Sequence, residues 1–175
     1  MDVSKINSLV ELYFKKVEQI DKKKPFLKWL NPKSNHQYNW EEVTEKIYKF
    51  SYKIQSLIKE GDRVLLLSEN RPEWLITDLA IMNAGGITVP IFTTYAERDY
   101  EYILNDCSPS LVIVSNDIQF EKIKKFIDNK KIISFEKIKT FSTTFESIFN
   151  EKYEKEINKN LSRKLPACII YTSGT

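Results

Sequence analysis

The sequence predicts an α/β fold with a mostly parallel sheet flanked by helices. Short, continuous apolar runs recur along the chain, which is typical of strands that a parallel sheet buries on both faces. Between the runs lie stretches whose apolar residues have helical spacing, and strands that alternate with helices indicate βαβ units. The expected strands are Arg63–Leu67, Ile87–Ile91, Leu111–Val114, Lys131–Ser134 and Cys168–Tyr171.

The N-terminal region predicts a helix from about Ser4 to Ile20, with Ser4 as its cap. Its apolar residues recur every three or four positions and so share one helical face. They are Ile6, Val10, Tyr13, Val17 and Ile20. An extended piece, Pro25–Leu30, follows, and Tyr38 on a partner strand would complete a small hairpin. His36 lies in the polar stretch between them and is interpreted as a loop residue.

The clearest helix is expected to begin at Asn39, which with Glu42 three residues later resembles a capping box. Gly61 is expected to end this helix as a C-terminal cap. An apolar stripe along one face predicts core packing and consists of Trp40, Val43, Ile47, Phe50, Ile54 and Leu57.

Further helices are expected between the strands. One has Pro72 in its first turn and runs to Gly85, with Leu75, Leu79 and Met82 on one face. The next two are Glu97–Asn105 and Ile118–Ile127, and their apolar positions are Tyr100, Ile103 and Leu104, and Ile118, Ile123, Phe126 and Ile127. The polar stretch Asn150–Lys164 predicts a solvated helix and loop.

Composition narrows the function classes. The chain has 175 residues, of which 42% are hydrophobic and 29% charged, as in an ordinary globular domain. The net charge is only +3, arginine is scarce and the lysine runs alternate with acids, which argues against nucleic-acid binding. The single histidine and the two cysteines, with no C-x-x-C pair, exclude a redox motif and a zinc site within these residues.

The expected location is the cytoplasm. The N-terminus lacks the basic start and apolar stretch of a signal peptide. No apolar run approaches the ~18–20 residues of a membrane span, although peripheral contact with a membrane stays open. Unpaired thiols fit a reducing compartment, and Cys107 and Cys168 are interpreted as inert thiols in or near the core.

The candidate site is the terminal segment Thr172, Ser173, Gly174 and Thr175. It follows a predicted strand at its carboxyl end, where open α/β sheets bind ligands. Hydroxyls donate to phosphate oxygens, and glycine lets backbone amides approach closely. The segment lacks the lysine of a Walker A loop, and most such tetrapeptides are plain turns.

Neighbouring residues add weight to the phosphate hypothesis. Tyr171-Thr-Ser-Gly-Thr175 resembles the start of the phosphate-binding signature of the adenylate-forming superfamily, which includes acyl-CoA synthetases, peptide-synthetase adenylation domains and luciferases. Further blocks resemble that superfamily in the same order: Tyr38–Val43, Gly61–Val64, Asn70–Trp74, Asn83–Pro90, Tyr102–Asp106 and Leu111–Ser115. The block Asn70-Arg-Pro-Glu-Trp74 looks most like long-chain fatty acyl-CoA synthetases. Phe92-Thr-Thr94 departs from the pattern, which more often has an aromatic residue, proline and threonine there.

The resemblance implies a fold, a reaction and a set of ligands. The fold would be the N-terminal part of the large domain of an adenylate-forming enzyme, with residues 1–175 as a truncated fragment that lacks the C-terminal lid domain. The reaction would be ATP-dependent activation of a long-chain fatty acid to acyl-AMP, followed by transfer to coenzyme A. Thr172, Ser173, Gly174 and Thr175 would bind the ATP phosphates, and Thr172 would approach Mg²⁺. No catalytic residue is expected within the chain, so these residues alone should be inactive.

Other interpretations remain open. The parent could be another adenylating enzyme, such as a peptide-synthetase adenylation domain or an aryl-CoA ligase. The chain could also be a non-catalytic α/β binding module that shares only the scaffold. Residues within the blocks that resemble the superfamily have simpler explanations as well: Trp74 as a packed helix residue, Arg71 as a local cap or ion-pair partner, and Gly85–Gly86 as a helix end that permits tight packing.

Overall fold

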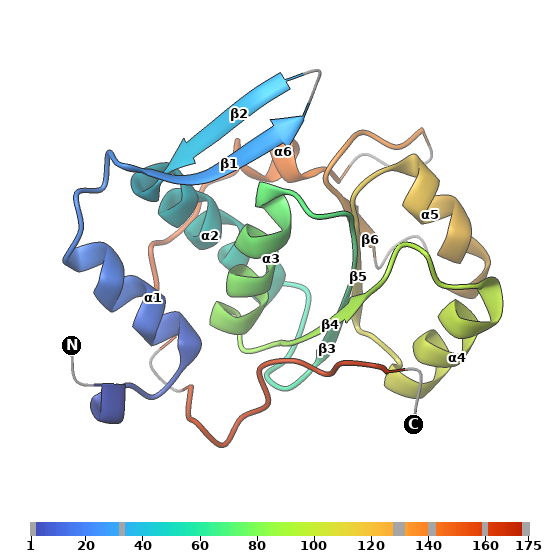
Figure 1. Ribbon diagram of the computed structural model, residues 1–175. Coiled ribbons are helices and arrows are strands. Elements are labelled where there is room, and N and C mark those ends of the chain that lie inside the picture. The colour runs from blue at the N-terminus through green and yellow to red at the C-terminus, as the bar shows by residue number, and fades with distance from the viewer. Residues whose placement is uncertain (1–2, 32–33, 128–131, 140–142, 159–160, 173–175) are drawn as a thin grey trace.

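A computed structural model describes residues 3–31, 34–127, 132–139, 143–158 and 161–172. Its centre is a parallel sheet in the order β4-β3-β5-β6 (Figure 1). The strands are β3 (Arg63–Leu67), β4 (Ile87–Ile91), β5 (Leu111–Val114) and β6 (Ile132–Ser134). The predicted α/β class is confirmed, together with these four of the expected strands.

Helices cover both faces of the sheet (Figure 1). On one side lie α1 (Leu9–Glu18), α2 (Trp40–Gln55) and α3 (Pro72–Asn83). On the other side lie α4 (Glu97–Cys107) and α5 (Asp117–Ile123), which continues into a 3₁₀ turn at Lys124–Phe126. Alternate residues of β3 enter the two separate cores: Val64 and Leu66 join α1–α3, whereas Leu65 and Leu67 join α4 and α5.

An antiparallel hairpin lies beside α2 and α3 (Figure 1). It consists of β1 (Pro25–Asn31) and β2 (Ser34–Asn39), as expected. The Phe26 and Trp40 rings stack with their centroids 3.7 Å apart, which joins the hairpin to the start of α2. His36 belongs to β2, so its assignment to a loop was wrong.

The predicted start of α2 is confirmed. The Glu42 backbone N–H donates to Asn39 Oδ1 at 2.9 Å, and the Asn39 N–H donates to Glu42 Oε2 at 2.8 Å. The predicted end is wrong, because α2 stops at Gln55 with Ser56 as its C-cap. Gly61, at φ +81°, instead forms the turn before β3, where its N–H donates to the Gly85 carbonyl at 2.8 Å.

The first helix also begins later than the apolar spacing predicted. Residues Val3–Lys5 form a short 3₁₀ helix, and Ser8 caps α1 by accepting a hydrogen bond from the Glu11 N–H at 3.1 Å. Tyr13 and Val17 are buried as expected. Phe14 is buried too, since the core-facing stripe of α1 is wider than the predicted one.

Three further expectations need correction. Cys168–Tyr171 is not a strand, since its only bridge is Cys168 to Thr88 and Ile170 is 64% exposed. In the described parts of Asn150–Lys164 there is no helix, and the short helix α6 (Phe145–Ile148) precedes that stretch. In α5 the predicted position Ile123 is buried, and so is Phe120, whereas Ile118 is 68% exposed because it lies on the solvent side of the helix.

Arg71 joins three parts of the fold. Its Nε donates to Glu73 Oε2 at 2.9 Å and its Nη1 donates to Glu136 Oε1 at 2.7 Å, just after β6. The guanidinium also lies over the Trp29 ring of β1, 4.7 Å from its centroid. The side chains of Arg71 and Glu73 are only 9% and 11% exposed, so the two charges depend on each other.

Replacing Arg71 should therefore destabilise the fold strongly. We expect Arg71→Ala to lower the free energy of unfolding by about 3–5 kcal/mol, because it leaves the Glu73 carboxylate buried without its partner. Denaturant titration measures the change. Arg98→Ala removes the same charge from a side chain that is 89% exposed, and it should stay within about 0.5 kcal/mol of wild type. Equal effects of the two substitutions would contradict this role of Arg71.

The glycine pair after α3 allows close packing, as expected. A Cβ on Gly86 would lie 2.7 Å from Ile58 Cδ1 and 3.0 Å from Ile81 Cγ2. Gly86→Ala should therefore cost about 1–3 kcal/mol of stability through overpacking. Adding Ile58→Val removes the nearest carbon, so the double variant should recover part of the loss when thermal or denaturant unfolding is measured. Strictly additive losses would show that the two residues do not compete for space.

Candidate functional site

The segment that carries the predicted phosphate loop runs along the free edge of β4 (Figure 1). The Thr88 N–H donates to the Ala167 carbonyl at 3.1 Å, and the Ile169 N–H donates to the Thr88 carbonyl at 2.9 Å. The segment is parallel to β4, so it leads Thr172 towards the carboxyl edge of the sheet. Thr172 is exposed there, while Ser173, Gly174 and Thr175 lie outside the described residues.

A second polar group occupies the same edge of the sheet. The loop after β3 leads to α3 on one face and the loop after β5 leads to α5 on the other, so the carboxyl edge between β3 and β5 is a topological switch point. Glu69 follows β3 at this point and accepts hydrogen bonds from Ser115 Oγ at 2.5 Å and Gln119 Nε2 at 2.6 Å. Burial alone would raise the pKa of Glu69, but hydrogen bonds led by that from Ser115 outweigh it and hold this pKa below its ordinary value.

The hydrogen bonds continue from Gln119 to the loop after β4. Lys122 Nζ donates to Gln119 Oε1 at 2.9 Å and to the Thr93 carbonyl at 2.5 Å. A chain of polar contacts thus links the ends of β3, β5 and β4. Sequence reasoning missed Glu69, Ser115 and Gln119, although polar residues directly after two predicted strands were an available signal.

Thr172 is exposed at this edge, and its hydroxyl and backbone N–H are groups that can donate hydrogen bonds to an anion. No group of three or more His, Cys, Asp or Glu side chains that could hold a metal occurs among the described residues. Within that same part of the chain, no helix is long and apolar enough to cross a membrane.

The two cysteines differ in their surroundings. Cys107 is buried at the end of α4, and burial raises the pKa of its thiol to about 11, as expected of an inert core residue. Cys168 is exposed, so its expected position in or near the core was wrong. It is exposed because its segment forms only a single bridge with β4.

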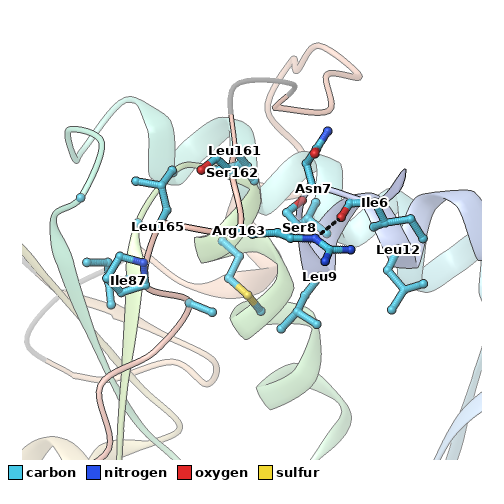
Figure 2. Close-up of a pocket in the computed structure, with 17 residues that line it drawn as sticks. Ile6, Asn7, Ser8, Leu9, Leu12, Ile87, Leu161, Ser162, Arg163 and Leu165 are labelled. Carbon is cyan, nitrogen blue, oxygen red and sulfur yellow. Dashed lines mark hydrogen bonds between the residues drawn. The ribbon is translucent and has the colours of Figure 1, made fainter. Parts of the chain in front are cut away.

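A largely apolar cavity of about 390 Å³ lies at the opposite, amino edge of the sheet (Figure 2). Its walls are the start of α1, the Gly85–Gly86 turn and residues 161–167. Arg163 Nε donates to the Ile6 carbonyl at 2.7 Å and joins two of these walls, as the dashed line in Figure 2 shows. Thr172 does not line this cavity, so the cavity and the predicted phosphate loop are separate features.

Curated relatives are longer proteins that resemble this chain over part of their length. The long-chain-fatty-acid–CoA ligase ACSBG1 of Homo sapiens is 29% identical over 132 residues, which cover 67% of this chain and 18% of the relative. The long-chain-fatty-acid–CoA ligase ACSBG2 of Xenopus laevis is 28% identical over 156 residues, which cover 78% of this chain and 21% of the relative. The chain therefore spans about a fifth of the length of these relatives.

Solved structures share the fold at low sequence identity. A long-chain-fatty-acid-CoA ligase (FadD1) from Archaeoglobus fulgidus superposes with a TM-score of 0.77 at 20% identity, covering 97% of this chain and 35% of that one. The anthranilate CoA ligase AuaEII has a TM-score of 0.75, also at 20% identity, and covers 99% and 33%. At such identities the likeness concerns the fold alone.

The model of the family described as AMP-binding enzyme matches residues 14–175. This range includes every helix and strand of the described fold from α2 onwards and the segment that ends in Thr172. The match therefore rests on nearly the whole chain. The chain belongs to the AMP-binding enzyme family.

Proposed function

We propose that this chain is the N-terminal part of the large domain of an acyl-CoA ligase, with its C-terminal lid domain in the remainder of a longer protein. The intact enzyme would activate a long-chain fatty acid with ATP to acyl-AMP and then transfer the acyl group to coenzyme A. The carrying observation is the family match over residues 14–175, which includes an exposed Thr172 at the carboxyl edge of the sheet. The long-chain substrate is supported by the names of the curated relatives.

The chemical difficulty of the first step is charge. A carboxylate must attack the α-phosphate of ATP, and the two reactants are both anions. Hydroxyl and amide donors lower this barrier by stabilising negative charge on the phosphate oxygens. We assign that role to Thr172, Ser173, Gly174 and Thr175, which would hold the β- and γ-phosphates.

Mg²⁺ fits this arrangement as a companion of the nucleotide. It prefers oxygen ligands and is commonly held by substrate phosphates, water and one or two protein oxygens. Thr172 would supply one hydroxyl oxygen, consistent with its exposure at the edge. When bound, the ion would neutralise phosphate charge.

The substrate class is the point at which rival enzymes differ. The same fold occurs in a protein named as an anthranilate CoA ligase, so the fold is compatible with an aryl substrate as well as a fatty acid. An aryl-CoA ligase is therefore the second candidate. The sequence relatives favour the fatty acid.

One prediction of this proposal concerns the phosphate loop, Thr172–Thr175, in the full-length enzyme. Thr172→Ala should slow acyl-AMP formation by about 10²-fold, the usual cost of removing one donor from a developing anion. Thioester formation from pre-made acyl-AMP should be unaffected, because pyrophosphate has left before that step. Pyrophosphate exchange and coenzyme A-dependent AMP release measure the two half-reactions. Thr172→Ser should restore the rate, and Thr94→Ala, another exposed residue at this edge, should have no effect. Equal damage to both half-reactions would contradict the assignment.

Another prediction of this proposal concerns the length of the acyl chain that the enzyme prefers. Each methylene buried in an apolar tunnel adds about 0.8 kcal/mol of binding, so activity should rise from acetate through octanoate to palmitate. AMP release by the full-length enzyme, with and without coenzyme A, measures the preference. The panel also includes benzoate, anthranilate and amino acids. A best substrate among these would replace the fatty acid while leaving the adenylation chemistry in place.

A further inference from the structure

The backbone contacts that hold the loop segment against β4 stop short of Thr172. The N–H and C=O of Thr88 both bond to this segment, and the same groups of Pro90 point to the same edge because direction alternates along a strand. Pro90 has no N–H, so the Ile169 carbonyl receives no donor from it. Among the described residues, no backbone hydrogen bond joins 170–172 to β4.

Beyond the last backbone contact with β4, side chains provide the hydrogen bonds to this segment. Tyr95 Oη donates to the backbone carbonyl of Tyr171 at 3.2 Å. Tyr171 Oη in turn donates to Asp106 Oδ2 at 2.5 Å, near the end of α4. Both the backbone and the side chain of Tyr171 are therefore held from the α4 side of the sheet.

Tyr95 is itself held firmly enough to act as a fixed donor. Its ring makes T-shaped contacts with the rings of Phe92 and Tyr100, whose centroids are 5.3 and 6.2 Å away. Tyr100 Oη donates to the Phe92 carbonyl at 3.0 Å, which ties the loop after β4 to α4. Tyr95 lies in this loop, and α4 begins two residues after it.

The peptide bond carries this constraint into the predicted phosphate loop. The Tyr171 carbonyl and the Thr172 N–H belong to one planar unit, so holding the carbonyl sets the direction of the N–H. We infer that Tyr95 and Asp106 are positioning residues of the phosphate loop, which orient the Thr172 amide towards the ATP phosphates. This inference rests on the proposed function for the role of the phosphates, whereas the anchoring of Tyr171 stands on contacts within the chain.

Two tyrosine-to-phenylalanine substitutions, one at Tyr95 and one at Tyr102, test the positioning role of Tyr95. Tyr95→Phe removes only the hydroxyl that holds the Tyr171 carbonyl. Tyr102→Phe is the matched control, since its ring packs edge-on against Tyr171 with centroids 6.4 Å apart and its hydroxyl makes no hydrogen bond in the described structure. In the full-length enzyme Tyr95→Phe should raise the KM for ATP about three- to tenfold, the factor that one ordinary hydrogen bond is worth. Thioester formation from acyl-AMP should be unchanged, and Tyr102→Phe should match wild type in both assays.

Asp106 provides a second, independent pair. Asp106→Ala removes the acceptor of Tyr171 and should raise the KM for ATP in the same way. Asp106→Asn keeps an acceptor oxygen at the same place and should restore the wild-type value. If Ala and Asn behave alike, Asp106 does not position the loop.

A measurement of backbone order in the full-length protein separates this inference from the proposed function. The NMR order parameter of the Thr172 N–H should fall towards the range below about 0.6 of flexible backbone in Tyr95→Phe, but stay at the wild-type value in Tyr102→Phe. An inactive full-length enzyme with this difference in order would overturn the proposed function and keep the anchor. Equal order parameters, equal KM values for the two variants, or a fall in thermal midpoint that accounts for the whole effect of Tyr95→Phe, would overturn the inference.

Discussion

The burial of β3 on both faces is the constraint on which the rest of this structure depends. Val64, Leu65, Leu66 and Leu67 are all fully buried in the centre of the sheet. A strand of this kind needs apolar partners above and below, so helices must cover both faces. Parallel pairing of β3 with β4 and β5 then requires crossover helices, which supply that cover.

The same parallel arrangement gathers polar groups at one edge. All strands of the sheet end there, so the loops that follow β3, β4 and β5 meet although they are distant in sequence. Glu69 and Gln119 are hydrogen-bonded at this edge, and Lys122 links them to the loop after β4. Next to them, Arg71 pairs with Glu73 and Glu136 and stacks on Trp29 of the hairpin, so it joins α3, the loop after β6 and the hairpin. Hydrogen bonds and ion pairs thus join the loops of this edge next to an exposed Thr172, an arrangement that suits the anion-binding role proposed for it.

The division between fold and function follows from this geometry. The sheet and its helices position the segment that ends in Thr172 and the residues that hold it. A pocket for the carboxylate substrate would need residues beyond those of this chain. The curated relatives are about four times as long as this chain, and the proposed acyl and coenzyme A sites are assigned to that additional length. The proposed enzyme would therefore separate the common chemistry of adenylation from the choice of substrate.

Local signals in the sequence determined much of this protein. Continuous apolar runs specified β3–β6, the Asn39–Glu42 pair specified the start of α2, and Pro72 specified the start of α3, because each depends on neighbours in sequence. Only the tertiary structure decided that Cys168–Tyr171 is an edge segment, since its apolar residues match a strand but Pro90 offers no donor to extend the ladder. It also decided that Tyr95 and Asp106 hold Tyr171 from 76 and 65 residues away. Such contacts carry no periodic signal, because they arise only when parallel strands bring distant loops to one edge.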